Sequence, residues 1–230
     1  MDGFRYGELT ERGVMIDLNQ MVERFLGEAV RQCVEESPDD DAVIRALNNR
    51  NESAEIRRTA VLKWLRSYSV LRRLNNDEAR TIGDGILEFA DARGALVRPL
   101  SEAEIIEKFT DLHEKYRLLV RPKKDQTPRD LVSLTSKALW CCYPDAIPIY
   151  DSNARCALGV LSRLMGLDRP ADAMPYTRFL SVWFNLYDHV TIDDDRLGGY
   201  LYKVKVFDRV LWIIGQPDYG EKTRQPASAL

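Results

Sequence analysis

The stretch DLNQMVERFLGEAVRQCVEE, residues 17–36, decides the fold class of this chain. Its apolar residues recur at spacings of three and four, which places them on one face of an α-helix. They are Leu18, Met21, Val22, Phe25, Leu26, Ala29, Val30 and Cys33. Ser37-Pro38 predicts the end of this helix, because proline lacks an amide donor and disfavours helical backbone in the preceding residue. The acidic run 39–41 then predicts the start of a short helix over 42–47.

The same periodicity continues along the rest of the chain. It predicts a long helix over 53–74, with an inward stripe made of Ile56, Ala60, Trp64, Tyr68, Leu71 and Leu74. Asn75 predicts the start of a helix that ends near residue 91, and Ser101 with Glu104 forms a capping box for a helix to about 119. Further helices are predicted over 134–143, 152–165, 175–189 and 200–214. No segment alternates in the way of a strand, so we predict an all-α protein of roughly nine helices.

The chain is long enough for one large domain or two small ones. A short apolar connector over 95–100 contains Pro99 and interrupts the helices. We therefore expect an N-terminal helical part over 1–100 and a second helical part over 101–215. Residues 216–230 are rich in polar residues, proline and alanine and predict a flexible tail.

Composition limits the classes of function. The 230 residues include 33 basic and 36 acidic side chains, a net charge of −3. This balance argues against a histone-like nucleic-acid binder, whose affinity depends on a large positive charge. No apolar run approaches the roughly 18 residues that span a bilayer, and the first residues lack the layout of a signal peptide. We therefore expect a cytoplasmic protein without membrane contacts.

The four cysteines do not form a metal-binding pattern. Cys141 and Cys142 are adjacent, Cys33 is remote, and Cys156 follows in the next predicted helix, which matches no zinc spacing. The sequence predicts free buried thiols, with no metal and no cofactor.

The predicted helix over 53–74 has a strongly basic outer face. It carries six basic residues: Arg57, Arg58, Lys63, Arg66, Arg72 and Arg73. Two interpretations are open. The charges can pair with neighbouring acids on a solvated face, or they can form a surface that contacts phosphates.

Candidate chemistry is concentrated in LVSLTSKALWCCYPDAIPIYDSNARCALGVLSR, residues 131–163. Asp151-Ser152-Asn153 is a natural N-cap sequence, so Asp151 is predicted to cap the helix that follows. The apolar residues before it would also half-bury its carboxylate, which can then stabilise a cation or accept a proton from water. Lys137 lies on an apolar helix, where it either extends to solvent, pairs with Asp151, or is desolvated enough to act as a nucleophile.

This segment resembles the helix-hairpin-helix (HhH-GPD) DNA glycosylases, as a divergent member. The resemblance rests on LVSLTSK over 131–137, an apolar helix, a loop with Pro148, and DSNAR over 151–155 opening the next helix. LSRLMGL over 161–167 is similar to the R-L-G-L ending of those proteins. Ser133 and Thr135 stand where the family's hairpin has glycines, and the spacing from Lys137 to Asp151 is shorter than in the family.

The resemblance implies an all-α bundle and a double-stranded DNA partner containing a modified base, in base excision repair or in defence against modified phage DNA. Asp151 would support the positive charge on the sugar, and Lys137 would occupy the position of the nucleophilic lysine that forms a Schiff base. The target base would leave the duplex and enter a pocket. Residues that would contact it are Trp140, Tyr143, Tyr150, Ser152 and Asn153; core packing is the alternative for Trp140. Contacts to the DNA backbone would come from Ser133, Thr135, Ser136, Arg121, Lys123, Lys124, Arg129 and Arg155.

Two other functions compete with this one. A nucleic-acid-binding protein without catalysis would keep the basic surfaces and use Asp151 only as a helix cap. A helical protein-interaction adaptor would have negligible DNA affinity and an exposed apolar helix face. The sequence does not indicate the oligomeric state.

Overall fold

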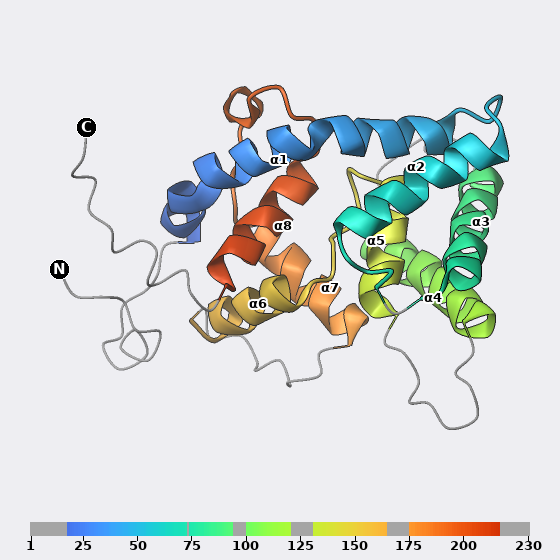
Figure 1. Cartoon of the computed structure of the whole chain (residues 1–230). Helices are drawn as coiled ribbons and strands as arrows, with labels where there is room; N and C mark the ends of the chain where they lie inside the picture. Colours follow the sequence, from blue (N-terminus) through green and yellow to red (C-terminus); the bar gives the residue numbers. More distant parts are fainter. Residues whose placement is uncertain (1–17, 73, 94–99, 121–130, 165–174, 217–230) are drawn as a thin grey trace. The chain divides into compact units, whose positions relative to one another are not determined.

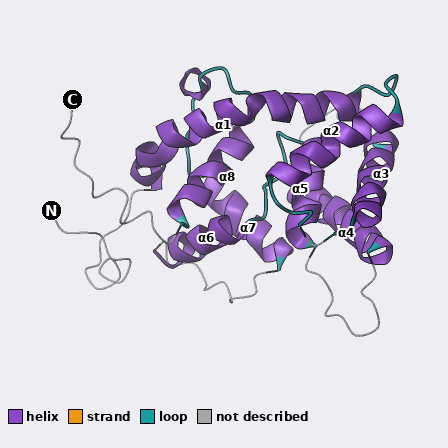
Figure 2. Ribbon diagram, viewed as in Figure 1, coloured by secondary structure: helices purple, strands orange, loops and turns teal. Residues whose placement is uncertain are grey.

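The computed structural model describes residues 18–72, 74–93, 100–120, 131–164 and 175–216 (Figure 1). Within these ranges the chain forms α-helices and one short 3-10 helix, and no strand (Figure 2). The predicted all-α class is confirmed. The helices are α1 (Leu18–Asn48), α2 (Ala54–Ser67), α3 (Asn76–Ala92), α4 (Glu102–Leu119), α5 (Val132–Cys142), α6 (Ser152–Leu164), α7 (Tyr176–Tyr187), the 3-10 helix η1 (Asp194–Leu197) and α8 (Lys203–Ile214).

The chain divides into two compact units. Unit 1 combines Met1–Cys33 with Asp151–Leu230, and unit 2 is Val34–Tyr150. The boundaries therefore lie inside α1 and directly before Asp151, rather than near residue 100 as the sequence suggested. In unit 1, α6 packs against α7 and α8; in unit 2, α3 packs against α2 and α4, and α5 packs against α2 and α4.

α1 continues through Pro38, where the sequence predicted a helix end. A proline inside a helix costs about 3 kcal/mol. The residues after it offset this cost, because Val43 and Leu47 are buried in unit 2 and each such side chain contributes about 1.5–3 kcal/mol. Asp40 is also buried and accepts a hydrogen bond of 2.7 Å from the indole Nε1 of Trp64. The two helices predicted over 17–36 and 42–47 are thus one, which leaves eight α-helices in the described residues.

α2 is shorter than the predicted helix over 53–74. It ends at Ser67, and Ser69 adopts a left-handed backbone conformation with φ of 59°. A left-handed residue cannot continue a right-handed helix, so Leu71 reaches its buried position from a turn. Ile56, predicted to face inward, is 55% exposed.

Both predicted capping sequences are confirmed. The Asn75 side chain accepts a hydrogen bond from the amide of Glu78, whose carboxylate accepts one from the Asn75 amide. Ser101 and Glu104 make the same reciprocal pair at the start of α4. Each box satisfies amide groups that have no partner within the helix.

Each unit has a core built around tryptophan. In unit 2 the rings of Trp64 and Trp140 stack with centroids 5.2 Å apart and an interplanar angle of 6°. In unit 1, Trp183 packs edge-on against Phe207 and donates a hydrogen bond of 2.7 Å to the buried Asp208. The indole N–H groups of Trp64 and Trp183 each donate to a buried carboxylate, Asp40 and Asp208 respectively. Both groups are therefore satisfied inside an apolar environment.

Three of the four cysteines are buried and none of the four forms a disulfide. Cys156 is exposed on α6, so the prediction of a buried thiol was wrong at that position. Across the described residues, no cluster of three His, Cys, Asp or Glu side chains is placed to hold a metal ion. None of the described helices combines the length and apolar character that crossing a membrane requires.

Candidate functional site

The segment predicted to form a hairpin turn before Lys137 is already helical. α5 begins at Val132, so Ser133 and Thr135 lie in its first turns. The Thr135 amide donates to the Leu131 carbonyl at 2.8 Å, and the Thr135 hydroxyl donates to the same oxygen at 2.8 Å. Thr135 and Ser136 are fully buried. Their side chains therefore serve packing in this structure, and their position does not support the predicted contacts with a DNA backbone.

Two neighbouring side chains of α5 hold the backbone of Tyr150 from both sides. The Tyr150 amide donates to Ser136 Oγ at 3.0 Å, and Lys137 Nζ donates to the Tyr150 carbonyl oxygen at 3.4 Å. Residues 147–150 lie outside the helices, and no strand includes them. The two bonds therefore satisfy backbone groups that are buried outside regular structure. We call this pair of contacts the Tyr150 clamp.

Lys137 is buried, with 2% of its surface exposed. Its ammonium also donates to Ser133 Oγ at 2.8 Å and lies 5.6 Å from the centre of the Tyr68 ring. The interpretation in which Lys137 extends to solvent is therefore wrong. A buried ammonium requires such partners, because leaving it without them carries a large desolvation cost.

Asp151 is the first residue of the second segment of unit 1 and caps α6, as predicted. Its Oδ1 accepts a hydrogen bond of 2.9 Å from the Asn153 amide, and its carbonyl accepts one of 2.9 Å from the Arg155 amide. Asp151 is partly exposed. Its carboxylate is thus fixed in orientation and still reachable from solvent, which is the arrangement that a charge-stabilising group needs.

The first turn of α6 is positioned by the end of α8. Gly215, the C-cap residue of α8, lies so close to Asn153 that an added Cβ would be 2.6 Å from the Asn153 carbonyl carbon. Asp208, seven residues earlier, is held by Trp183 in the unit 1 core. The end of α8, from Asp208 to Gly215, therefore supports the helix that Asp151 caps.

The aromatic residues predicted to contact a base are largely enclosed. Trp140 is fully buried in its stack with Trp64, so core packing is the correct interpretation for it. Tyr143 is buried, with the cationic groups of Arg93 and Lys108 at 5.5 and 5.6 Å from its ring centre. Burial raises the pKa of the Tyr143 hydroxyl, Cys142 raises it further, and Arg93 lowers it. Tyr150 is 8% exposed.

The structure groups the predicted residues by unit. Ser133, Ser136, Lys137 and Tyr150 come together in unit 2. In unit 1 the predicted residues share the start of α6: Asp151, Ser152, Asn153 and Arg155. Four predicted DNA-backbone residues lie outside the described residues: Arg121, Lys123, Lys124 and Arg129. Sequence reasoning missed the clamping role of Ser136 and the packing role of Gly215.

Most of the described basic residues of α2 are paired with acids of unit 2. Arg57 is buried, donates to the Ala46 carbonyl at 2.8 Å and forms an ion pair of 2.6 Å with Asp91. Its guanidinium holds the pKa of Asp91 below the usual range; burial partly opposes this effect. Arg58 pairs with Asp84 and Glu55, and Lys63 pairs with Asp39 at 2.7 Å. For these three residues the pairing interpretation is correct.

Comparison with known proteins gives no relative. No protein-family model matches the chain, and neither the curated proteins nor the solved structures include a match.

Proposed function

We propose that this protein is a DNA glycosylase-like enzyme that releases a modified base from double-stranded DNA by hydrolysis. The observation that carries the proposal is the placement of Asp151. Its carboxylate is fixed by the Asn153 amide at the start of α6, and the residue before it is held by the Tyr150 clamp. The resemblance of residues 131–155 to helix-hairpin-helix DNA glycosylases supplies the reaction class.

In the proposed reaction, the bond between C1′ of the deoxyribose and the base nitrogen breaks. The base leaves with the bonding electron pair, and positive charge develops on the sugar. Asp151 stabilises this charge, and a water molecule adds its oxygen to C1′. The proton released by the water passes to the Asp151 carboxylate and then to solvent, while the base takes up a proton. The products are the free base and an abasic site.

We assign Lys137 a positioning role in this proposal rather than that of a Schiff-base nucleophile. Its ammonium already donates to Ser133 Oγ and to the Tyr150 carbonyl and is almost fully buried. A nucleophilic amine must be neutral and reach the sugar carbon. The contacts of Lys137 instead fix the backbone immediately before Asp151.

The test is incubation of the purified protein with end-labelled duplexes carrying modified bases, and with modified phage DNA, followed by hot alkali and gel analysis. The key variant is Asp151→Asn. Asparagine is as good a helix cap as aspartate, so this change removes the negative charge while keeping the cap. The matched control is Asp188→Asn, which removes an exposed carboxylate elsewhere in unit 1.

We expect strand breaks with the wild type and with Asp188→Asn, and none with Asp151→Asn. Borohydride added in parallel should trap no adduct; an adduct that is lost in Lys137→Gln would return Lys137 to the role of nucleophile. If neither the wild type nor any variant breaks any substrate, a protein that binds without catalysis becomes the better account.

A further inference from the structure

A cavity of about 230 Å³ lies in unit 2, where α2 is followed by the connection to α3. The described residues that line it all fall within residues 66–79: Arg66, Ser69, Leu71, Arg72, Leu74, Asn76 and Ala79. Backbone hydrogen bonds shape the connection, from the Ser69 amide to the Arg66 carbonyl at 2.9 Å and from the Leu74 amide to the Leu71 carbonyl at 3.0 Å. The cavity walls are therefore held by the main chain as well as by side chains.

The described residues that line the cavity include two arginines and no acidic residue. Arg66 and Arg72 are both exposed, and within the described residues neither forms an ion pair. They differ in this from Arg57, Arg58 and Lys63, each of which is paired with an acid. Unpaired arginines beside a hollow are suited to bind phosphate groups through charge-assisted hydrogen bonds.

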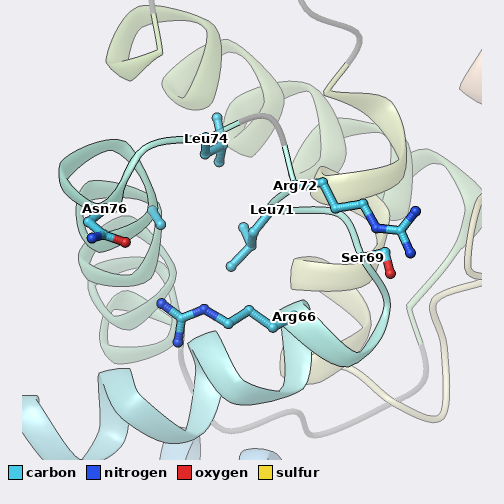
Figure 3. A pocket seen from close by; sticks show the side chains of 7 residues that line it. Arg66, Ser69, Leu71, Arg72, Leu74 and Asn76 are labelled. Carbon is cyan, nitrogen blue, oxygen red and sulfur yellow. The ribbon is translucent and has the colours of Figure 1, made fainter.

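The two arginines mark different sides of the cavity. In Figure 3, Arg66 extends from α2 toward α3, where Asn76 lies, while Arg72 points the other way and lies near Ser69. Leu71 lies between them and, with Leu74 and Ala79, supplies an apolar wall. The cavity is smaller than the roughly 300–1,000 Å³ of a pocket for a drug-sized ligand. Its chemistry matches a chain that carries anionic groups at intervals, with apolar sugar between them.

We propose that this cavity binds the sugar–phosphate backbone of DNA, with Arg66 and Arg72 contacting different phosphates and the apolar wall contacting the sugar between them. Ser69 and Asn76 add a hydroxyl and an amide donor at the two sides. Contacts of this kind position a protein on DNA without reading its sequence. The inference rests on the proposed function, because it takes DNA as the ligand.

The experiment measures binding of a fluorescent, unmodified duplex by anisotropy at several salt concentrations. The test variant combines Arg66→Gln and Arg72→Gln. The control variant combines Lys63→Gln and Lys115→Gln, which removes the same charge from cations paired with Asp39 and Glu88 in the same unit. Circular dichroism checks that each variant keeps its helices.

We expect the test variant to bind DNA about a hundredfold more weakly, since it removes two charge-assisted contacts that each contribute roughly tenfold. The slope of log Kd against log salt should fall by about 1.8, because each phosphate contact contributes about 0.9. The control variant should stay close to the wild type. Equal loss in both variants, no loss in either, or no DNA binding by the wild type would each overturn the inference.

The same reagents separate this inference from the proposed function. If the wild type releases bases and the test variant keeps the wild-type salt slope, the cavity inference fails and the proposed function stands. If the wild type binds DNA with the expected dependence on Arg66 and Arg72 but releases no base, the proposed catalysis fails and the cavity remains a DNA-binding site.

Discussion

Replacing Gly215 by alanine is expected to destabilise unit 1 for a steric reason alone. Gly215 has φ of −81° and ψ of −1°, which alanine adopts without strain. The added Cβ would, however, overlap the Asn153 carbonyl oxygen and lie 2.6 Å from the carbonyl carbon and 3.0 Å from the Cα of Asn153. These are backbone atoms in the first turn of α6, so no side-chain rotation relieves the overlap.

The loss of stability in Gly215→Ala should be large, because the backbone of Asn153 cannot move aside as a side chain could. An extra methylene in a packed interior costs about 1–3 kcal/mol where side chains can adjust. Because the start of α6 itself must move, we expect the upper end of this range, about 3 kcal/mol. For a chain of 230 residues each kcal/mol changes Tm by about 2–4 °C, so Tm should fall by about 6–12 °C. Thermal unfolding followed by circular dichroism measures this shift.

Gly27→Ala in α1 is the matched control within unit 1. An added Cβ at Gly27 has no atom within 4 Å. Since glycine in a helix interior is about 0.5–1 kcal/mol less favourable than alanine, this change should raise Tm slightly. Two glycine-to-alanine changes are thus expected to act in opposite directions. A Tm of Gly215→Ala equal to or above the wild-type value would show that α8 does not approach Asn153 as described.

Three further predictions concern unit 2. Ser136→Ala removes the acceptor of the buried Tyr150 amide and should lower the free energy of unfolding by about 1–3 kcal/mol in urea titrations; Thr59→Ala, at an exposed hydroxyl that bonds within α2, should leave it unchanged or slightly raised. Trp140→Ala should cost about 3–5 kcal/mol in the same assay, because the ring is fully buried, and an unchanged urea midpoint would contradict that burial. Burial raises the pKa of the Cys142 thiol from 9.0 to about 11, although Arg93 opposes it. The unfolded thiol therefore ionises first as pH rises, and the free energy of unfolding should fall between pH 9 and 11 by up to about 1.4 kcal/mol per pH unit; a Cys142→Ala variant with the same pH dependence would assign the loss to other groups.

Local signals in the sequence predicted local structure well. The helix start at Asn75 and the capping box of Ser101 with Glu104 depend on residues within one turn of each other, and both are present. The prediction failed at Pro38 because the helix there is supported by packing of later residues in unit 2. It also failed beyond Ser67, where periodicity continued but the left-handed backbone of Ser69 changed the direction of the chain.

At the candidate site, too, the sequence predicted local contacts and did not predict contacts between distant residues. The capping role of Asp151 follows from its own tripeptide and is confirmed. The Tyr150 clamp was not predictable, since Ser136 and Lys137 reach across 14 and 13 residues to the same peptide. The pairing of Arg57 with Asp91 spans 34 residues, a distance at which the sequence pattern gives no pairing rule. From the basic stripe alone, the paired Arg57 and Arg58 therefore could not be told from Arg66 and Arg72 at the cavity.

The division of the chain has a consequence for the order of folding. Unit 2 is one continuous segment, whereas unit 1 needs residues from before and after it. Asn19 donates to the His189 carbonyl across 170 positions, and Glu23 pairs with Arg196 across 173. Closing so large a loop is entropically costly until the intervening chain is compact. During synthesis on the ribosome, we therefore expect unit 2 to fold first. The core of unit 1, which includes the first half of α1, can form only after α8 has been synthesised.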